Sequence, residues 1–440
     1  MSSSSEPTNA AGTSPEKPLA RRSRRRRHAE PALQDEARVD DRPEPERYPL
    51  TIDPERLDHD AAKVVRRLTR HGLEAYLVGG CVRDLLVGKV PKDFDVATNA
   101  RPDDVRRLFR NSRIIGRRFR LVHVIFGGGK VIETATFRRP PNESSDDTDD
   151  LLIRSDNAFG EAFEDAVRRD FTINGLFYDL ECGEVLDWVG GMRDIERKAV
   201  HTIGTPVVRF REDPVRILRA IKFAARLDFG ITPETYDAIV QCRGALAMAA
   251  RPRLFEELMR LMRSGSSHRC LWLAWETGVL DVLLPELAAY LADADGPHGN
   301  VWRILSELDR QVASRSEPFD DTILCTVLLL EPLREACHGS KDRVRAASDF
   351  LEPLVDRLNV PRRITDSVRR IVAILPRLEA GRPGRFARTP LYTSAHQVLQ
   401  LTQGTTTAAG ARIEELPPPT SEVGRRQRPR RRGRRSREGS

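Results

Sequence analysis

The order of apolar and polar positions divides this chain into a mixed first part and a helical second part. Between residues 50 and 199, short stretches with a period of two alternate with stretches in which apolar residues recur every three or four positions. The first pattern predicts strands and the second predicts helices. We expect helices near 54–71, 81–88, 101–109 and 159–170, and strands near 74–80, 92–98, 120–128, 130–138, 174–180 and 183–191. The sequence thus predicts an α/β head, a small mixed β-sheet with flanking helices, over 48–199.

After residue 200 the strand pattern stops, and helical periodicity continues to about residue 402. The clearest helical stretches are residues 211–227, 234–242, 251–265 and 269–284. We divide this all-α part into a neck at 200–265 and a body at 266–402.

Composition marks both ends as different from the folded part. Residues 1–47 are rich in Ser, Pro, Arg and Glu, and residues 403–440 in Thr, Ala, Pro and Arg, so we expect both to be disordered. Of the formal charge of +8, the stretch RRQRPRRRGRRSREGS at 425–440 alone carries +8, which leaves residues 48–424 nearly neutral. Such a tail suits a polyanion such as nucleic acid, although a plain solubility tail has the same composition.

Cysteine usage and hydropathy bear on the compartment. The six cysteines are scattered without a CxxC pair, which argues against a zinc module or a disulfide framework. No stretch approaches the roughly 18 apolar residues of a membrane span, and the first residues lack the apolar core of a signal peptide. We therefore expect a cytoplasmic protein with no membrane partner.

Two aspartates in KDFDVAT carry the strongest chemical signal. Asp93 and Asp95 are two residues apart in a strand pattern, so both side chains leave the same face. Like charges this close repel unless a cation lies between them, and Mg²⁺ (or Mn²⁺) prefers such oxygen ligands. Glu133 in VIETATF is the candidate third ligand of a two-metal site. The alternative is an ordinary surface pair, which is the commoner origin of DxD.

The preceding VGGCVRD favours the functional interpretation. Gly79 and Gly80 lie where a strand turns into a helix, so that backbone amides can approach triphosphate oxygens, and Arg83 adds a planar cation. An ordinary strand-to-helix turn would look the same. No Gly-Lys-Ser/Thr follows, which excludes a Walker A loop.

Two later motifs hold polar groups suited to a nucleotide. In VRRDFTING, Arg169 can reach a phosphate or a ribose, while Asp170 either joins the catalytic carboxylates or only orients neighbouring arginines. In EDPVRILRA, the side chains at positions i, i+3 and i+6 lie on nearly one helical face and can read an adenine edge as acceptor and donors. These three residues are Asp213, Arg216 and Arg219. Alone, they would more simply be solvated ion pairs.

The motifs LVGGCVRDLLVG, KDFDVAT, ETATFR, RRDFTING and EDPVRILRAIKF, in this order over roughly 50–275, resemble those of the bacterial poly(A) polymerase and tRNA CCA-adding nucleotidyltransferases. The resemblance implies a head, neck, body and tail, with ATP held between head and neck. It assigns nucleotide base recognition to the neck at 200–265 and RNA binding to the body at 266–402. It also implies template-independent transfer of AMP to RNA 3′ ends, as in polyadenylation that promotes RNA decay and processing. It places Asp170 with Asp93, Asp95 and Glu133 as catalytic residues.

The choice between poly(A) and CCA addition depends on other segments. IIGRRFRLVHVIFG resembles the poly(A) polymerase version, and its Arg117, Arg118 and Arg120 are candidates for RNA contact. A nonspecific basic tail also suits many RNA ends better than one tRNA shape; its RNA-binding candidates are Arg425, Arg426, Arg430, Arg431 and Arg432. A CCA-adding enzyme and a noncatalytic RNA-binding protein remain the alternatives, and no protein partner is indicated.

Overall fold

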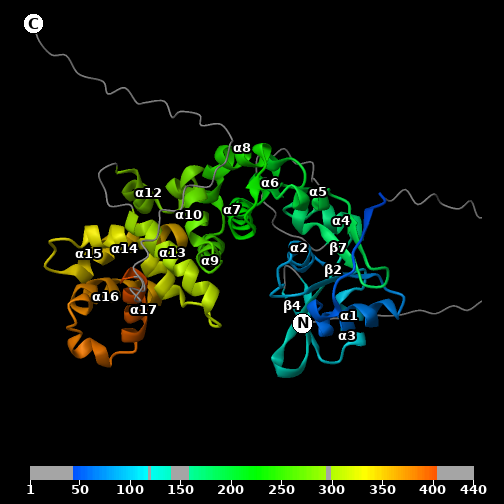
Figure 1. The fold of residues 1–440 in the computed structure, drawn as a ribbon, viewed down its shortest axis with the longest axis horizontal. Coiled ribbons are helices and arrows are strands. Elements are labelled where there is room, and N and C mark those ends of the chain that lie inside the picture. Colours follow the sequence, from blue (N-terminus) through cyan, green and yellow to red (C-terminus); the bar gives the residue numbers. More distant parts are fainter. Residues whose placement is uncertain (1–42, 117–119, 140–157, 294–298, 404–440) are drawn as a thin grey trace, which may run out of the picture. The chain divides into compact units, whose positions relative to one another are not determined.

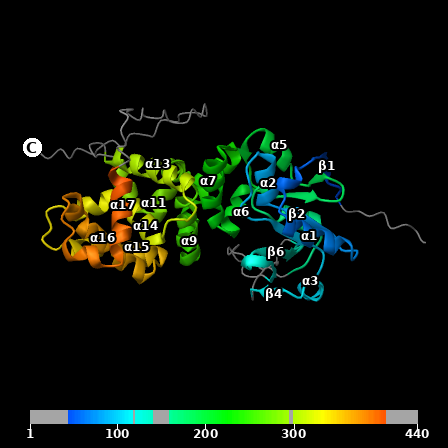
Figure 2. The ribbon, with the colours of Figure 1, turned by 60° about the horizontal axis from the view of Figure 1, so that its bottom comes forward.

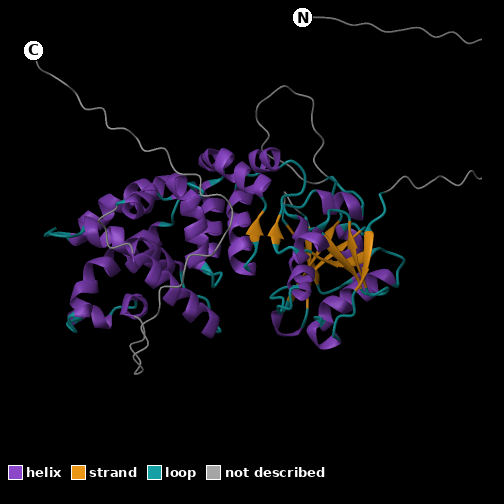
Figure 3. Cartoon of the chain, turned by 45° about the horizontal axis from the view of Figure 1, so that its top comes forward, coloured by secondary structure: helices purple, strands orange, loops and turns teal. Residues whose placement is uncertain are grey.

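A computed structural model describes residues 43–116, 120–139, 158–293 and 299–403 of the chain. Its first part contains an eight-stranded sheet in the order β1-β8-β7-β2-β3-β6-β5-β4, drawn in orange in Figure 3. Neighbouring strands are antiparallel except β3 and β6, which are parallel, so the sheet is mixed as predicted. The strands are β1 (Glu46–Pro49), β2 (Ala75–Val78), β3 (Asp95–Thr98), β4 (Ser112–Ile115), β5 (Leu121–Ile125), β6 (Val131–Thr136), β7 (Leu176–Asp179) and β8 (Glu184–Asp187).

Both faces of the central strands are buried because successive side chains point to opposite sides. Leu77 of β2 and Val96 of β3 pack against α1 (His59–Thr69), α2 (Gly80–Leu86) and α3 (Pro102–Leu108). Val78 and Ala97 pack on the other face with α4 (Ala162–Val167). A short helix, α5 (Gly191–Glu196), follows β8. The sheet is therefore a rigid platform for whatever side chains lie at the ends of β2 and β3.

The remainder of the described chain is helical, and one continuous core runs through it from Phe171 to Leu401. α14 is its central helix, with buried residues on all sides. Figure 2 shows that helices α13 to α17 lie together, and the colours in Figure 1 follow the chain from the head through these helices. The helices are α6 (Pro206–Glu212), α7 (Val215–Leu227), α8 (Pro233–Cys242), α9 (Arg251–Met262), α10 (Ser267–Glu276), α11 (Val279–Leu283), α12 (Pro285–Ala292), α13 (Gly299–Ser314), α14 (Asp321–Ala336), α15 (Arg343–Leu358), α16 (Arg362–Glu379) and α17 (Leu391–Gln403).

The predicted α/β head followed by helices is confirmed, and three details of the prediction are wrong. Residues 46–47, expected to be disordered, begin β1, because its backbone completes the edge of the sheet next to β8. Strands do not stop at 200, since β9 (Ala199–Val200) pairs with β10 (Gly230–Ile231) after α7. The helix expected at 54–71 begins only at His59, where Asp58 caps it, after a short 3₁₀ turn. The rest of the segments expected to be disordered, 1–42 and 404–440, lies outside the described residues.

The other expectations from composition concern cysteines and membranes. All six cysteines are free thiols, five of them buried and Cys182 exposed. No helix in the described ranges is both long and apolar enough to cross a membrane. The domain boundaries at 199 and 265 remain predictions.

A buried ion-pair cluster ties α2 to α7. Asp84 accepts hydrogen bonds from Arg83 Nε and Nη2, at 2.9 and 2.7 Å, and from Arg226 Nη2 at 2.7 Å. Asp84 is 3% exposed, so one buried carboxylate is the shared counter-ion of two guanidinium groups. Lys89 adds a hydrogen bond to the Arg226 carbonyl at 2.6 Å.

Asp84→Asn should destabilise the fold by about 3 kcal/mol, because it leaves two largely buried arginines without their counter-ion. The free energy of unfolding in urea measures this. Asp103→Asn is the matched control: Asp103 is exposed on α3, and its replacement should change the stability by less than about 0.5 kcal/mol. Equal stabilities of the two variants would contradict the role given to Asp84.

Candidate active site

The register of the sheet places a row of side chains next to the Gly-Gly turn. Asp95 is the first residue of β3, and its partner on the parallel strand β6 is Glu133. The row continues on both sides. Glu133 is opposite His123 of the neighbouring strand β5, and Asp95 is opposite Val78 of the neighbouring strand β2. Register partners project from the same face of a sheet. Both predicted carboxylates therefore leave one face, one strand away from the chain at Gly79.

Electrostatics distinguish Asp95 from an ordinary surface acid. Burial, and then the charges of Glu133 and Asp93, raise the pKa of Asp95 to about 6, although Arg169 opposes them. Asp93 itself lies just before β3 and is exposed. The prediction that both aspartates lie on one strand is therefore wrong. They are nevertheless close enough for one charge to affect the other. Glu133 is half exposed, with His123 Nε2 3.5 Å from its Oε1.

These acids fit a divalent cation that shares its ligands with a substrate. In the described part of the chain, no three His, Cys, Asp or Glu side chains converge closely enough to hold a metal on their own. Mg²⁺ is usually held by only one or two carboxylates together with water and phosphate oxygens. A carboxylate whose pKa is raised by its acidic neighbours gains most from such a cation. Asp95 with Asp93, and Glu133 from the next strand, are therefore the candidate metal ligands.

The turn after β2 requires a glycine at its first position. Gly79 has φ +73°, and a Cβ there would lie 2.7 Å from Arg169 Nη1. Its amide donates to the Leu176 carbonyl at 3.1 Å, and α2 begins at the next residue. Gly80 is different, because a Cβ there would meet only Arg83 Nη2, at an ordinary 3.5 Å.

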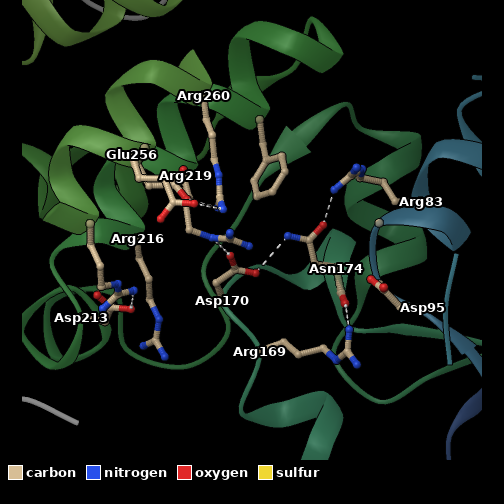
Figure 4. Close-up of a pocket in the computed structure, with 15 residues that line it drawn as sticks. Arg83, Asp95, Arg169, Asp170, Asn174, Asp213, Arg216, Arg219, Glu256 and Arg260 are labelled. Atoms are coloured by element: carbon tan, nitrogen blue, oxygen red, sulfur yellow. Dashed lines mark hydrogen bonds and ion pairs between the residues drawn. The ribbon is translucent and has the colours of Figure 1, made fainter. Parts of the chain in front are cut away.

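A cavity of about 640 Å³ opens beside this turn, a size common for small-molecule sites. Figure 4 shows its lining side chains, which come from the sheet, the segment after α4, and helices α7 and α9. Nine residues predicted from the sequence line it: Gly79, Gly80, Arg83, Asp95, Arg169, Asp170, Asp213, Arg216 and Arg219. Asp93 and Glu133 do not line it. The predicted nucleotide-binding residues are thus brought together around one cavity with Asp95.

Asp170 holds other residues in place. Its Oδ2 accepts from Arg219 Nε at 2.6 Å, and its Oδ1 accepts from Asn174 Nδ2 and from the amide of Phe171, both at 2.9 Å. Burial would raise the pKa of Asp170, but the charge of Arg219 and the hydrogen bond from Asn174 hold it at about 2. With these partners, the geometry favours the orienting role over the catalytic role that the resemblance implied.

The two arginines next to the turn are also held by protein groups. Arg83 is 2% exposed, bonds to Asp84, and donates to Asn174 Oδ1 at 2.5 Å. Arg169 donates to Asp165 at 2.9 Å and to the Asn174 carbonyl at 3.2 Å. Both guanidinium groups contribute positive charge to the cavity, but Arg83 acts from a buried position behind it.

The candidate base-reading residues each have another partner. Asp213 accepts from Arg253 Nη2 of α9 at 2.9 Å. Arg216 donates to Glu212 Oε2 at 3.0 Å and to the Arg209 carbonyl at 3.1 Å. They line the cavity as predicted, but an adenine would have to displace or extend these contacts.

Sequence reasoning missed one wall of the cavity. Four charged residues of α9 form it, at positions i, i+3, i+4 and i+7: Arg253, Glu256, Glu257 and Arg260. Glu257 is buried between Lys222 Nζ, at 2.9 Å, and Arg260 Nη1, at 2.7 Å. Asn174 and Phe223, which the sequence analysis did not single out, also line the cavity. The signal in the sequence was the helical spacing of these four charged residues within α9, whose other positions are mostly apolar.

The predicted RNA contacts lie largely outside the described residues. Among them only Arg120 is described: it is exposed just before β5, and its carbonyl accepts from Arg138 Nη2 at 3.2 Å. Arg117 and Arg118, and the tail arginines from Arg425 to Arg432, fall in the ranges that the structure does not describe.

Comparison with known proteins identifies the family. A model of the poly A polymerase head domain matches residues 75–201, and a model described as a probable RNA- and SrmB-binding site of polymerase A matches residues 228–291. Poly(A) polymerase I of Salmonella typhimurium is 37% identical over 366 residues, 78% of each chain. This chain belongs to the poly(A) polymerase family. The Escherichia coli O157:H7 poly(A) polymerase I is 38% identical over the same share of both chains.

The poly(A) polymerase family is also related to CCA-adding enzymes. The CCA-adding enzyme of Geobacillus stearothermophilus is 37% identical over 230 residues, 52% of this chain and 55% of that one. The crystal structure of the Bacillus stearothermophilus CCA-adding enzyme in complex with CTP aligns with 80% of this chain and 78% of that chain, at 28% identity and a TM-score of 0.56. The chain is therefore a nucleotidyltransferase of this wider family, whose members generally use divalent metal ions.

Gly79→Ala should raise the KM for ATP on the order of tenfold, because the added Cβ strains the turn and displaces Arg169. Steady-state kinetics of nucleotide incorporation measure this. Gly80→Ala is the matched control, with an unstrained φ and a normal contact distance, and should change the KM less than about twofold. Similar KM values for the two variants would contradict the described turn.

Asp95→Asn should stabilise the metal-free protein at pH 7 by about 3 kcal/mol. The pKa of Asp95, about 6, lies above the ordinary 3.8, so the folded state holds this proton more tightly than the unfolded state. The fold consequently loses stability as the pH rises from about 4 to 6, and Asn removes that loss. Urea unfolding at pH 4 and pH 7 with a chelator tests this. A stability gain that is the same at both pH values would be inconsistent with carboxylate repulsion.

Proposed function

We propose that this protein is a polynucleotide adenylyltransferase that adds AMP from ATP to RNA 3′ ends and releases pyrophosphate. The observation that carries the proposal is the extent of the similarity. Likeness to poly(A) polymerases I continues over 78% of the chain, whereas likeness to the CCA-adding enzyme of Geobacillus stearothermophilus covers about half. The longer match is what distinguishes the two candidate relatives in sequence.

The charges around the cavity support nucleotidyl transfer. The 3′-oxygen of the RNA would form a bond to the α-phosphorus of ATP, with loss of the hydroxyl proton, while the bond from that phosphorus to pyrophosphate breaks. Mg²⁺ ions held by Asp93, Asp95 and Glu133 would lower the pKa of the attacking hydroxyl and neutralise the leaving pyrophosphate. Arg169 and the backbone at Gly79 lie beside Asp95 around the same cavity, where they can receive the triphosphate.

Base selection would come from the opposite side of the same cavity. Asp213 can accept from the exocyclic amine of adenine, and Arg216 or Arg219 can donate to a ring nitrogen. Asp170 holds Arg219 through its Nε, so the direction of this guanidinium is fixed before ATP arrives. Fixed donors discriminate between bases better than mobile ones, since little ordering is left to do on binding.

CCA addition is the second candidate, and it has its own support in the structural likeness to a CCA-adding enzyme bound to CTP. A noncatalytic RNA-binding protein on the same scaffold is less well supported. The acids are all present, and the raised pKa of Asp95 is typical of a working site rather than a decayed one.

Purified protein with ATP as the sole nucleotide should extend an unstructured RNA by many residues. A CCA-adding enzyme would instead use CTP and stop after completing the tRNA end. Gel analysis of both RNAs, with ATP or with CTP plus ATP, separates the two. Products that end at CCA on tRNA, with an unextended generic RNA, would overturn the adenylyltransferase assignment.

Asp95→Ala should lower AMP transfer by at least about a thousandfold, because it removes a charge that the reaction depends on, while RNA affinity stays within about twofold. Pyrophosphate release and a filter-binding assay measure the two effects. Asp103→Asn serves again as the exposed control. Substantial turnover by the Asp95 variant would refute the site.

A further inference from the structure

A second cavity, of about 1210 Å³, lies in the helical body between the start of α15, the outer face of α16 and the segment before α17. We call it the body groove. It shares no lining residue with the cavity around Asp95. Residues 228–291, which match the RNA-binding family model, do not contribute to it either. The body groove is therefore a separate feature that the catalytic site does not explain.

The body groove is strongly basic. Five cations line it, with one acid, Asp342, whose carboxylate caps α15 by accepting from the Arg345 amide at 3.0 Å. No carboxylate within the described ranges lies within ion-pair distance of any of the five, which are Lys341, Arg343, Arg370, Arg377 and Arg382.

Three arginines of α14, α15 and α16 outside the groove are neutralised. Arg357 of α15 pairs with Glu286 at 2.7 Å, and Arg369 of α16 pairs with Asp366 at 2.8 Å. Arg334 of α14 pairs with Glu331 at 2.8 Å and also with Glu379 at the end of α16. Five cations that gather around one groove without counter-ions in the described chain indicate an anionic ligand from outside the fold.

The floor of the body groove is apolar and includes an aromatic ring. Arg370, Ala373, Ile374 and Arg377 lie along one face of α16, at helical spacing, so that two cations flank two small or aliphatic side chains. The opposite face of α16 is buried in the core. Phe386 lies across the groove, half-buried and in contact with Tyr392 at 6.5 Å between ring centroids.

We propose that the body groove binds a single-stranded segment of RNA, upstream of the 3′ end that enters the catalytic cavity. Nucleotides combine a phosphate with a flat apolar base, and the groove combines cations with an aliphatic and aromatic floor. Binding of this type uses electrostatic contacts to the backbone and stacking of bases on aromatic rings, with little dependence on sequence. This inference rests on the proposed function only in taking RNA as the substrate.

The chemistry favours single strands over duplex RNA or an acidic peptide. A duplex hides its bases and is bound through its backbone and shape, so it has no use for the ring of Phe386 or the aliphatic stripe of α16. An acidic peptide carries its charges on flexible side chains without flat rings to stack. A chain that must hold many different RNAs also gains from a site that recognises what every unpaired nucleotide has in common.

The test removes three cations of the body groove in the full-length protein. The triple variant Arg370→Gln, Arg377→Gln, Arg382→Gln should weaken binding of an unstructured 20-nucleotide RNA on the order of tenfold or more at 0.1 M salt. The slope of log affinity against log salt should fall by about 2, since each lost contact with a single strand is worth about 0.7. Phe386→Leu keeps the apolar volume but should lower the affinity a further few-fold through lost stacking.

The matched control removes the same charge from α15 and α16 outside the body groove: Arg345→Gln, Arg362→Gln, Arg363→Gln. All three are exposed, and none lines the cavity. The control should change the salt slope by less than about 0.7. Equal effects of the two triple variants would mean that RNA affinity depends on overall positive charge and not on the groove, and would overturn the proposal.

Two further readouts separate this proposal from the proposed function. The RNA-binding measurement contains no ATP. Its result is therefore independent of which nucleotide the protein adds. AMP transfer to a primer of about six nucleotides, saturating in concentration, should be unchanged in the groove variant. Loss of that activity, or loss of affinity for tRNA and duplex RNA with unchanged affinity for the unstructured strand, would contradict a site for single strands.

Discussion

The active site depends on an unfavourable interaction that the sheet enforces. The parallel pairing of β3 with β6 sets Asp95 beside Glu133, and Asp93, just before β3, is close enough for its charge to affect Asp95. Because backbone hydrogen bonds fix the register, the side chains cannot move apart by more than a rotamer change. Burial, and then the charges of Glu133 and Asp93, raise the pKa of Asp95, and a divalent cation with a triphosphate is the chemistry that favours its charged form.

The other acids of the region behave in the opposite way, and the contrast explains their roles. Asp84 and Asp170 are buried and each is bonded to arginines, Asp84 to Arg226 and Asp170 to Arg219. These pairs set the positions of the positive groups around the cavity, whereas Asp95 stays without an ion pair in the described chain. The other acids that line the cavity, Asp213, Glu256 and Glu257, are likewise paired with cations, so Asp95 is the unpaired acid among the described lining residues. A nucleotide with a negative triphosphate and a polar base fits such a cavity.

Much of this arrangement was accessible from the sequence. Alternating patterns predicted β2, β3 and β6. Nine of the residues singled out in the five ordered motifs line the cavity. Patterns could not provide partners, because hydrogen bonds between residues distant in the chain depend on the fold. Asp170 was therefore left between two roles, and the bridge that Asn174 forms between Asp170 and Arg83 was not predicted. The charged stripe of α9 was overlooked since its neighbours in sequence are apolar, and β1 was overlooked because a polar edge strand resembles a linker.

The central claim is that Asp95 and its acidic neighbours hold a divalent cation. Mn²⁺ has the same ligand preferences as Mg²⁺ and can be followed by electron paramagnetic resonance. Wild-type protein should bind Mn²⁺ in the presence of ATP, and binding near pH 6 should release part of a proton as Asp95 ionises. Asp95→Asn should lose both the tight binding and the proton release. Unchanged Mn²⁺ affinity and proton release in that variant would contradict the account.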